Sequence, residues 1–309
     1  MGEIFSRKVK IMKKMLFIMN PFAGTRKAAR LLTDIMTIFN RAGYLVSAYM
    51  TQGPKEAEEI AFRYAKEMDL VVCCGGDGTF NETVAGVYQS GADVPLGYIP
   101  AGSTNDFANS LKLPLQILRA AQEIVEGVPK PFDLGKFGDR TFSYIASFGA
   151  FTRASYATPQ AAKNTFGHAA YVFGSIQELS QIHAIPVKME IDGEVYEDKY
   201  IFGAICNCTS MGGVLSLKPE LVDMQDGLFE VLLIRAPKDL AELGECLLAL
   251  QRKDCQCRMI TFVSGKKIKV EISEEVDWSL DGEKAEGQSV IEIENLQHAY
   301  KLMKRVEEE

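Results

Sequence analysis

The segment LVVCCGGDGT, Leu70 to Thr79, decides the fold class of this chain. The apolar run 70–74 is followed without a break by a loop with three glycines, and apolar residues at helical spacing resume at Val84 and Val87. A short apolar run that ends at glycine is typical of a buried strand, and the spacing after it is typical of a helix. The segment therefore predicts one strand–loop–helix unit of a parallel sheet.

The same alternation repeats on both sides of this segment. Strand patterns at 16–19, 44–50 and 94–99 alternate with helical patterns, and each strand pattern ends in a turn rich in Gly, Pro, Asn or Thr. Alternating strands and helices predict a parallel sheet with helices on both faces. We expect residues 1–135 to form this α/β nucleotide-binding domain.

The second part of the chain has a different pattern. Short strand-like segments are separated by Asp-Gly pairs, which are typical of hairpin turns. This pattern predicts a mainly antiparallel β domain, a β-sandwich, over residues 136–295. We leave open whether the tail, 296–309, returns to the first domain. The Asp-Gly pairs stand at 192–193, 226–227 and 281–282, and two inserted helical patterns stand near 161–182 and 237–250.

Composition excludes several classes of protein. Apolar residues make up 47% and charged residues 24% of the chain, and its net charge is −7. An acidic chain lacks the Lys and Arg that supply most of the affinity for nucleic acid, so we expect no nucleic-acid partner. No apolar run approaches the roughly 20 residues that cross a bilayer. Seven cysteines without a signal peptide predict free thiols in the cytoplasm, with zinc binding by the two Cys-x-Cys pairs as the alternative.

Two acidic residues follow neighbouring strands of the predicted sheet. In a parallel sheet the strand-to-helix loops emerge at one edge, so Asp77 and Asp106 should meet there. The glycines before the helix allow close approach to a phosphate, and the start of the helix offers free N–H groups. A carboxylate at this place would repel a phosphate unless it faced a cation, so the loops predict Mg²⁺. Helix capping is the alternative for either aspartate.

Three motifs of these loops resemble a known family. The motifs NPFAG (20–24), GGDGTFNE (75–82) and GSTND (102–106) resemble the diacylglycerol kinase catalytic-domain family, in particular the soluble bacterial lipid kinases related to sphingosine and ceramide kinases. NAD kinases and, more loosely, phosphofructokinases share the GGDGT motif, so the resemblance implies their α/β fold for the first domain. The family usually has threonine where this chain has Ser103, and the hydroxyl is kept.

The resemblance also implies which residues bind ATP and metal. It implies a catalytic Mg²⁺ near Asp77 and Asp106. It further implies a structural Mg²⁺ held by side chains of Asp223 and Asp226 and by the carbonyl of Leu228, for which a plain Asp-Gly turn is the alternative. The implied ATP contacts are Asn20, Pro21, Phe22, Thr51, Gly75, Gly76, Asp77, Gly78, Thr79, Asn81 and Ser103.

Two Asp-Gly-Glu sequences compete for the role of catalytic base. They occupy residues 192–194 and 281–283, and each also fits a type I′ hairpin turn. Composition does not choose between them, whereas the family's order of motifs implies the second. The resemblance therefore implies that Glu283 accepts the proton of the lipid hydroxyl and that Glu194 is a turn residue. Glu283 would then have to lie beside Asp77 in a cleft between the domains.

The implied function is an ATP- and Mg²⁺-dependent lipid kinase that phosphorylates diacylglycerol or a similar lipid. Such an enzyme would be cytoplasmic and would bind the inner face of the membrane peripherally, helped by the basic segment 7–14 or by a lipid on Gly2. Residues 146–173 would line an acyl slot or pack in the core. A homodimer is compatible with the sequence. A kinase of a soluble substrate, similar to NAD kinase, and a non-catalytic nucleotide-binding regulator are the alternative functions.

Overall fold

The computed structural model describes most of both predicted domains. Several sequence-based expectations lie outside the described residues: the helix near 161–182, the pattern at Gly2, and the acyl-slot segment beyond residue 149. In the part of the chain that is described, no helix has both the length and the apolar character needed to cross a membrane. The described ranges are 12–149, 183–211, 215–253, 255–273 and 275–306.

The first half contains a parallel sheet of four strands, as predicted. The strands lie in the spatial order β4 (Leu96–Pro100), β3 (Leu70–Gly75), β1 (Lys13–Met19) and β2 (Tyr44–Met50). The central strand β3 is buried along its whole length, whereas β2 at the edge of the sheet is largely accessible to solvent. A fully apolar strand needs cover on both faces, and this explains the continuous run of apolar residues in β3.

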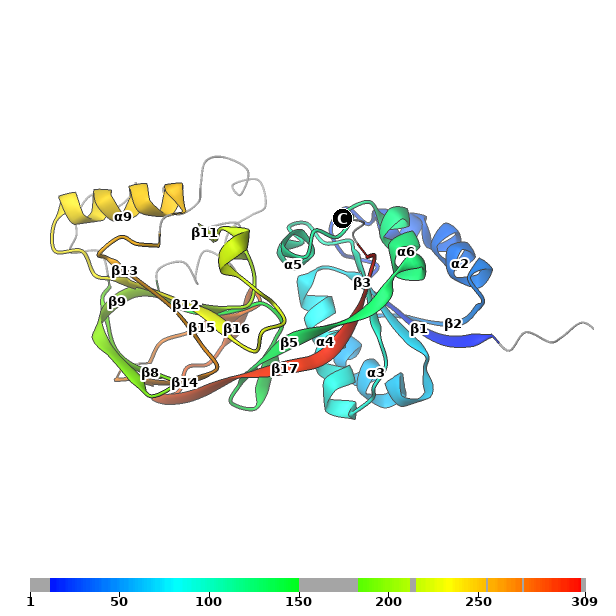
Figure 1. Ribbon diagram of the computed structural model, residues 1–309. Coiled ribbons are helices and arrows are strands. Elements are labelled where there is room, and N and C mark those ends of the chain that lie inside the picture. The colour runs from blue at the N-terminus through cyan, green and yellow to red at the C-terminus, as the bar shows by residue number, and fades with distance from the viewer. Residues whose placement is uncertain (1–11, 150–182, 212–214, 254, 274, 307–309) are drawn as a thin grey trace, which may run out of the picture.

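Helices cover both faces of this sheet (Figure 1). They are α1 (Lys27–Arg30), α2 (Leu32–Arg41), α3 (Glu56–Tyr64), the 3₁₀ turn η1 (Ala65–Glu67), α4 (Asp77–Ser90), α5 (Asp106–Ser110) and α6 (Ile117–Glu126). Alternate side chains of β3 point to opposite faces. Val71 and Cys73 pack with residues of α3 and α4, and Val72 and Cys74 pack with residues of α2 and α6.

The second half is mainly antiparallel, as predicted. Its inserted helix α9 (Leu240–Arg252) begins after Asp239, whose side chain accepts a hydrogen bond from Glu242 N. The remaining elements are β5 (Val128–Phe137), β6 (Arg140–Phe142), β7 (Ile145–Gly149), β8 (Ile185–Ile191), β9 (Glu194–Cys206), β10 (Ser210–Met211), β11 (Leu215–Ser216), η4 (Pro219–Leu221), β12 (Phe229–Arg235), β13 (Ile260–Gly265), β14 (Lys267–Ile272), β15 (Trp278–Leu280) and β16 (Glu283–Ala285).

One long strand, β17 (Val290–Lys304), runs through both halves (Figure 1). Its first part pairs antiparallel with β14, and its last part pairs antiparallel with β5 and parallel with β4 at Leu302. The register shifts between Leu296 and Tyr300, where His298 has a φ of 56°. Most of the strands therefore belong to one continuous sheet that changes from parallel to antiparallel pairing.

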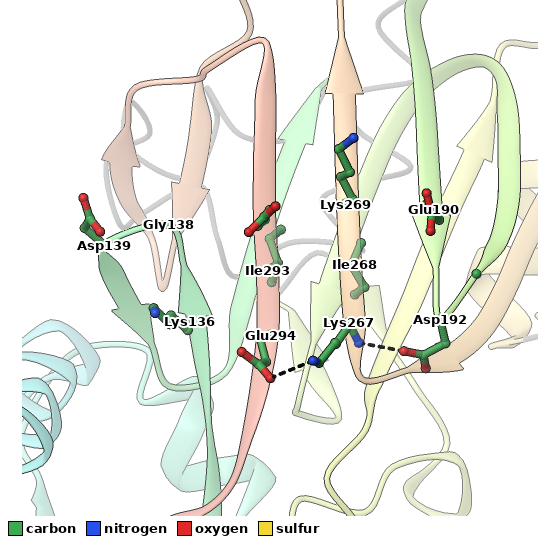
Figure 2. A pocket seen from close by; sticks show the side chains of 12 residues that line it. Lys136, Gly138, Asp139, Glu190, Asp192, Lys267, Ile268, Lys269, Ile293 and Glu294 are labelled. Carbon is green, nitrogen blue, oxygen red and sulfur yellow. Dashed lines mark hydrogen bonds and ion pairs between the residues drawn. The ribbon is translucent and has the colours of Figure 1, made fainter.

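Both Asp-Gly-Glu sequences form hairpin turns. Asp192 and Gly193 connect β8 to β9, and Asp281 and Gly282 connect β15 to β16. The first turn lies beside an open groove of about 680 Å³ whose walls are charged side chains of β8, β14 and β17 (Figure 2). There the carboxylate of Asp192 accepts hydrogen bonds from the backbone N–H groups of residues 266 and 267.

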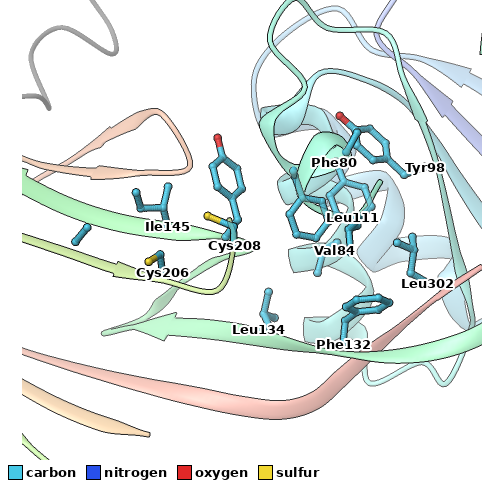
Figure 3. Packing of buried hydrophobic residues seen from close by; sticks show 14 of the residues in the cluster. Phe80, Val84, Tyr98, Leu111, Phe132, Leu134, Ile145, Cys206, Cys208 and Leu302 are labelled. Atoms are coloured by element: carbon cyan, nitrogen blue, oxygen red, sulfur yellow. The ribbon is translucent and has the colours of Figure 1, made fainter. Parts of the chain in front are cut away.

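An apolar cluster joins the two halves (Figure 3). The ring of Phe80 on α4 stacks on Phe107 of α5, with 5.1 Å between the ring centroids. The ring centroid of Phe107 lies 6.0 Å from that of Tyr144 in the second half. Phe132 of β5 stacks on Tyr300 of β17. All five rings are buried. Because buried apolar packing stabilises an interface between domains against relative motion, this cluster fixes α4 with respect to the antiparallel half.

Candidate active site

A pocket of about 430 Å³ lies at the carboxyl edge of the parallel strands. Four loops of the first half form most of its wall, and the β15–β16 turn of the second half contributes Glu283. This is the crevice in which open parallel sheets usually bind ligands. The lining residues are Asn20, Phe22, Ala23, Gly24, Thr51, Gln52, Gly53, Pro54, Gly76, Gly78, Thr79, Glu82, Gly102, Ser103 and Glu283.

Glycines allow these loops to approach one another closely. A Cβ on Gly102 would lie 2.6 Å from Gly76 Cα, and a Cβ on Gly24 would lie 2.5 Å from Ala101 O. Gly24 also has a φ of 51°, which favours glycine. Gly76 caps α4 without any side-chain hydrogen bond. The first N–H groups of α4 therefore face a backbone-walled hollow, which fits a phosphate group.

Other predicted nucleotide residues stand around this hollow. Asn20 Nδ2 donates to Thr79 Oγ1 at 3.5 Å, and Asn20 Oδ1 accepts from Phe22 N at 2.9 Å. Thr51 Oγ1 donates to Met19 O. The ring of Phe22 is 62% exposed. Pro21, Gly75, Asp77 and Asn81 are the predicted nucleotide residues that are not among the pocket-lining ones.

Asp77 and Asp106 lie together. The surroundings of Asp77 fit both alternatives given for it, a cation ligand and a helix cap. The Asp77 carboxylate accepts hydrogen bonds from Asp106 N at 3.0 Å, Phe107 N at 3.3 Å and Tyr98 Oη at 3.3 Å. It therefore caps α5, the helix that follows the next strand. Burial and the charge of Asp106 raise the pKa of Asp77 to about 6. Asp106 Oδ1 accepts from Ser210 Oγ of the second half at 2.9 Å.

Glu283 reaches the start of α4 from the second half. A Cβ on Gly78 would lie 3.3 Å from Glu283 Oε1, so the carboxylate is next to the residue after Asp77. The side chain of Glu283 is 49% exposed, and its Oε2 lies 3.8 Å from Arg140 Nη2. A carboxylate that is accessible and close to a phosphate-sized hollow is suited to accept a proton from an incoming hydroxyl.

The two halves of the chain match two family models. Residues 14–137 match the diacylglycerol kinase catalytic domain, and residues 145–299 match the YegS C-terminal NAD kinase beta sandwich-like domain. The chain belongs to the diacylglycerol kinase family. It is thus a member of a family of lipid kinases.

Relatives of this family member are similar over most of its length. A diacylglycerol kinase of Bacillus subtilis is 31% identical over 88% of this chain and 90% of its own. A diacylglycerol kinase of Staphylococcus saprophyticus is 32% identical over 88% of this chain and 89% of its own. The crystal structure of a diacylglycerol kinase from Bacillus anthracis superposes with a TM-score of 0.72 at 25% identity, over 95% of this chain and 97% of that one.

Sequence reasoning gave Asp281 of this family member only as the first residue of the second Asp-Gly-Glu motif, and missed the contacts that its side chain makes next to the site. Its side chain is 5% exposed and accepts three backbone hydrogen bonds, from Ser143 N at 2.5 Å, Tyr144 N at 3.0 Å and Ile145 N at 2.9 Å. Burial raises the pKa of Asp281 to about 7, although the three N–H donors act in the opposite direction. In the sequence, this position carried the signal of an Asp-Gly turn and of the family's late Asp-Gly-Glu motif, and neither indicates burial.

The residues predicted to hold a structural cation form a tight turn. Asp223 Oδ1 accepts from Gln225 N, and Asp226 Oδ1 accepts from Leu228 N. Leu228 O already accepts from Asn295 Nδ2 of β17. The atoms that would ligate the cation are all oxygens, as a hard cation requires. In the described part of the chain, no group of three or more His, Cys, Asp or Glu residues is arranged to hold a metal ion alone.

Proposed function

We propose that this family member transfers the γ-phosphoryl group of ATP to the hydroxyl of diacylglycerol or of a similar lipid. The observation that carries the proposal is the shared pocket, in which Glu283 faces the glycine-rich start of α4. Phosphoryl transfer needs a phosphate cradle and a proton acceptor within reach of one pair of substrates. The diacylglycerol kinases to which the chain is similar support a lipid as the acceptor.

The phosphates of ATP would lie against the first N–H groups of α4, because these groups and the helix dipole favour negative charge. Gly76 and Gly102 leave the space for them, and the hydroxyl of Ser103 faces the same hollow. Asn81 is directed elsewhere, to Ser143. The proposed contacts with ATP are therefore Asn20, Pro21, Phe22, Thr51, Gly75, Gly76, Asp77, Gly78, Thr79 and Ser103.

Asp77 and Asp106 are the residues that would hold the catalytic Mg²⁺. Their oxygens fit a hard cation, and Mg²⁺ in kinases is usually held by one or two carboxylates together with the phosphates, so no larger cluster is needed. When bound, the cation would neutralise charge on the phosphates. A second Mg²⁺ at Asp223, Asp226 and Leu228 O would brace the turn that is bonded to β17.

Glu283 would act as the general base. As the lipid hydroxyl oxygen bonds to the γ-phosphorus, the bond from that phosphorus to the β–γ bridging oxygen breaks and ADP leaves. The hydroxyl proton passes to the Glu283 carboxylate. Arg140, next to Glu283, contributes positive charge at the same mouth of the pocket.

The second half, residues 136–295, would supply the lipid site, and the first half, 1–135, the nucleotide site. For residues 146–173, lining an acyl slot and packing in the core are the two alternatives, and of the described ones Ala146 and Phe148 are buried in the antiparallel core. These two therefore pack rather than line a slot. We place the enzyme in the cytoplasm, bound peripherally to the inner face of the membrane where its substrate lies.

Transfer of labelled phosphate from ATP to a panel of acceptors tests this function. We expect diacylglycerol, ceramide or sphingosine in mixed micelles to be labelled, and NAD not to be. Labelling of NAD alone would instead support a kinase of a soluble substrate. ATP binding without any transfer would support a nucleotide-binding regulator.

The proposed role of Asp77 as a Mg²⁺ ligand is best tested with a more conservative substitution than alanine. Since this carboxylate caps α5, Asp77→Ala would remove the cap as well as a cation ligand. Asp77→Asn keeps one acceptor for the cap, and we expect it to raise the Mg²⁺ concentration needed for half-maximal transfer by at least tenfold. Asp34→Asn, on the exposed side of α2, is the matched control and should leave that concentration unchanged.

A further inference from the structure

The turn that carries Glu283 stands at the margin of the sheet. Its strands β15 and β16 are three residues long each, and β16 is the terminal strand in the order of the described sheet. Among the described strands, the hairpin pairs with the rest of the sheet only through β15 and β7. Such a short edge hairpin gains little stability from its own hydrogen bonds. Trp278, Leu280 and Ala285 pack the strands of the hairpin into the antiparallel core, and the turn that carries Glu283 has an anchor of its own.

Asp281 provides that anchor from inside the protein. Its two carboxylate oxygens accept the N–H groups of three consecutive residues, Ser143, Tyr144 and Ile145, and its own N–H donates to Ile145 O at 2.9 Å. These four hydrogen bonds tie the turn to the loop between β6 and β7. Hydrogen bonds to a buried charged group are among the stronger ones in proteins.

The same loop is tied to the nucleotide half. Ser143 Oγ donates to Asn81 Oδ1 at 3.0 Å, and both side chains are buried. Asn81 lies on α4, one helical turn after Asp77 and three residues after Gly78, next to which the Glu283 carboxylate lies. The path from α4 through Asn81, Ser143 and Asp281 to Glu283 thus closes into a ring around one edge of the pocket.

We propose that Asn81, Ser143 and Asp281 form a positioning chain that sets the place of Glu283 relative to the start of α4. This proposal rests on the proposed function of Glu283 as general base. It gives Asn81 a part in positioning in place of a contact with nucleotide. Asp281 and Ser143 are positioning residues too, since neither lines the pocket.

The expected effect of breaking the chain is on the chemical step. A displacement of a catalytic group by about 1 Å lowers rates by up to about 100-fold, even when the substrates still bind. Loss of a contact with ATP would instead weaken ATP binding. The positioning chain therefore predicts that its disruption lowers kcat and changes the Kd of ATP and the KM of lipid very little.

Ser143→Ala tests the link between the halves with the smallest change in volume. We expect kcat to fall about tenfold while the Kd of ATP stays within twofold of the wild type. Ser90→Ala is the matched control, because Ser90 is a buried serine on α4 with its own hydrogen bonds far along the helix. Ser90→Ala should lower thermal stability and leave kcat unchanged. Equal kcat values for Ser143→Ala and the wild type would overturn the link.

Asn81→Ala separates positioning from nucleotide binding. The positioning chain predicts the same fall in kcat as in Ser143→Ala, and no further fall in the double variant. A rise of tenfold or more in the Kd of ATP would show that Asn81 contacts the nucleotide, and would overturn its place in the chain.

Hydrogen exchange tests the anchor without any need for activity. In Asp281→Asn we expect the backbone amides of residues 143–145 and 279–285 to exchange at least tenfold faster than in the wild type. Asp192→Asn, which loses acceptors at the same place of the other Asp-Gly-Glu turn, should leave these amides unchanged. Unchanged exchange in Asp281→Asn would refute the anchor. If the wild-type protein fails to phosphorylate lipid while Asp281→Asn shows this faster exchange, the proposed function is refuted and the anchor is supported.

Discussion

The two Asp-Gly-Glu turns of this protein are nearly identical locally. Asp192 and Asp281 have φ angles of 47° and 50°, and the glycines that follow have φ angles of 94° and 88°. In both turns the aspartate accepts backbone N–H groups from another segment. The three-residue sequence therefore determines the turn in the same way at both places.

Their surroundings differ completely. Asp192 and Glu194 are exposed beside a groove of mixed charge, and Glu194 Oε2 accepts a hydrogen bond from Tyr196 Oη. Asp281 is buried against the β6–β7 loop, and Glu283 extends over the start of α4. One motif thus gives a plain hairpin in one place and a candidate catalytic group in the other, because the neighbouring elements differ.

Replacement of the glutamate in each turn should give the largest difference in activity between the two turns. We expect Glu283→Gln to lower kcat for lipid phosphorylation by about 10²- to 10⁴-fold, since a general base contributes about this much. Glu194→Gln should stay within twofold of the wild type. Steady-state assays on both variants give the answer, and comparable losses in the two would remove the distinction between the turns.

The next largest effect should be a pH dependence of stability that comes from the burial of Asp281. The pKa of Asp281 is raised to about 7 by burial, so the folded state binds this proton more tightly than the unfolded state does. The resulting stabilisation is complete below the unfolded pKa of about 4 and is lost as pH rises through 7. The contribution changes by about 1.4 kcal/mol per pH unit within this window.

Urea unfolding at pH 5, 6, 7 and 8 measures this contribution. The difference in unfolding free energy between the wild type and Asp281→Asn should shrink as pH rises from 5 to 7 and then stay level. A pH-independent difference for Asp281→Asn would contradict the expected titration.

Alanine in place of each turn glycine should have equal effects on stability and unequal effects on function. Both glycines have a left-handed φ and open space around the site of a Cβ, so each substitution should cost about 1 kcal/mol. Only Gly282→Ala should also reduce kcat, because it distorts the turn that carries Glu283. Thermal unfolding and assays of both variants provide the measurement, with unequal stability losses arguing against a purely local cost.

The smallest effect is expected at Arg140. Its ion pair with Glu283 joins two side chains that are each about half exposed, and exposed pairs contribute less than about 1 kcal/mol. Arg140→Ala should therefore change the unfolding temperature by no more than a few degrees. Raising the salt concentration to 0.5 M should reduce the difference from the wild type, and a difference that grows with salt would exclude an ionic origin.

The fold and the meeting of the loops could be read from local sequence. The apolar run of β3 and the glycines after it are enough to predict a buried parallel strand with a phosphate-sized turn, since both depend on neighbours in sequence. The same local patterns identified α9 near its observed place. Asp77 and Asp106 follow neighbouring parallel strands, and strand geometry alone predicts that they meet.

Long-range contacts explain what the sequence could not provide. That Asp77 caps α5 rather than its own helix depends on how β3 and β4 are placed side by side. That Asn81 bonds to Ser143 depends on the packing of α4 against the second half. Asp281 carried the same turn signal as Asp192, and although the family's order of motifs favoured the second turn, nothing local predicted that Asp281 is buried against the β6–β7 loop.

The course of β17 has a consequence for how the protein is made. A ribosome adds Leu302 of β17 206 residues after its sheet partner Leu96 of β4 and 172 residues after its partner Lys130 of β5. Until then the nucleotide half has an unpaired sheet edge, and pairing over so long a separation in sequence is slow. Neither half can complete its part of the sheet until residues 290–304 have been made, because β17 pairs with strands of both.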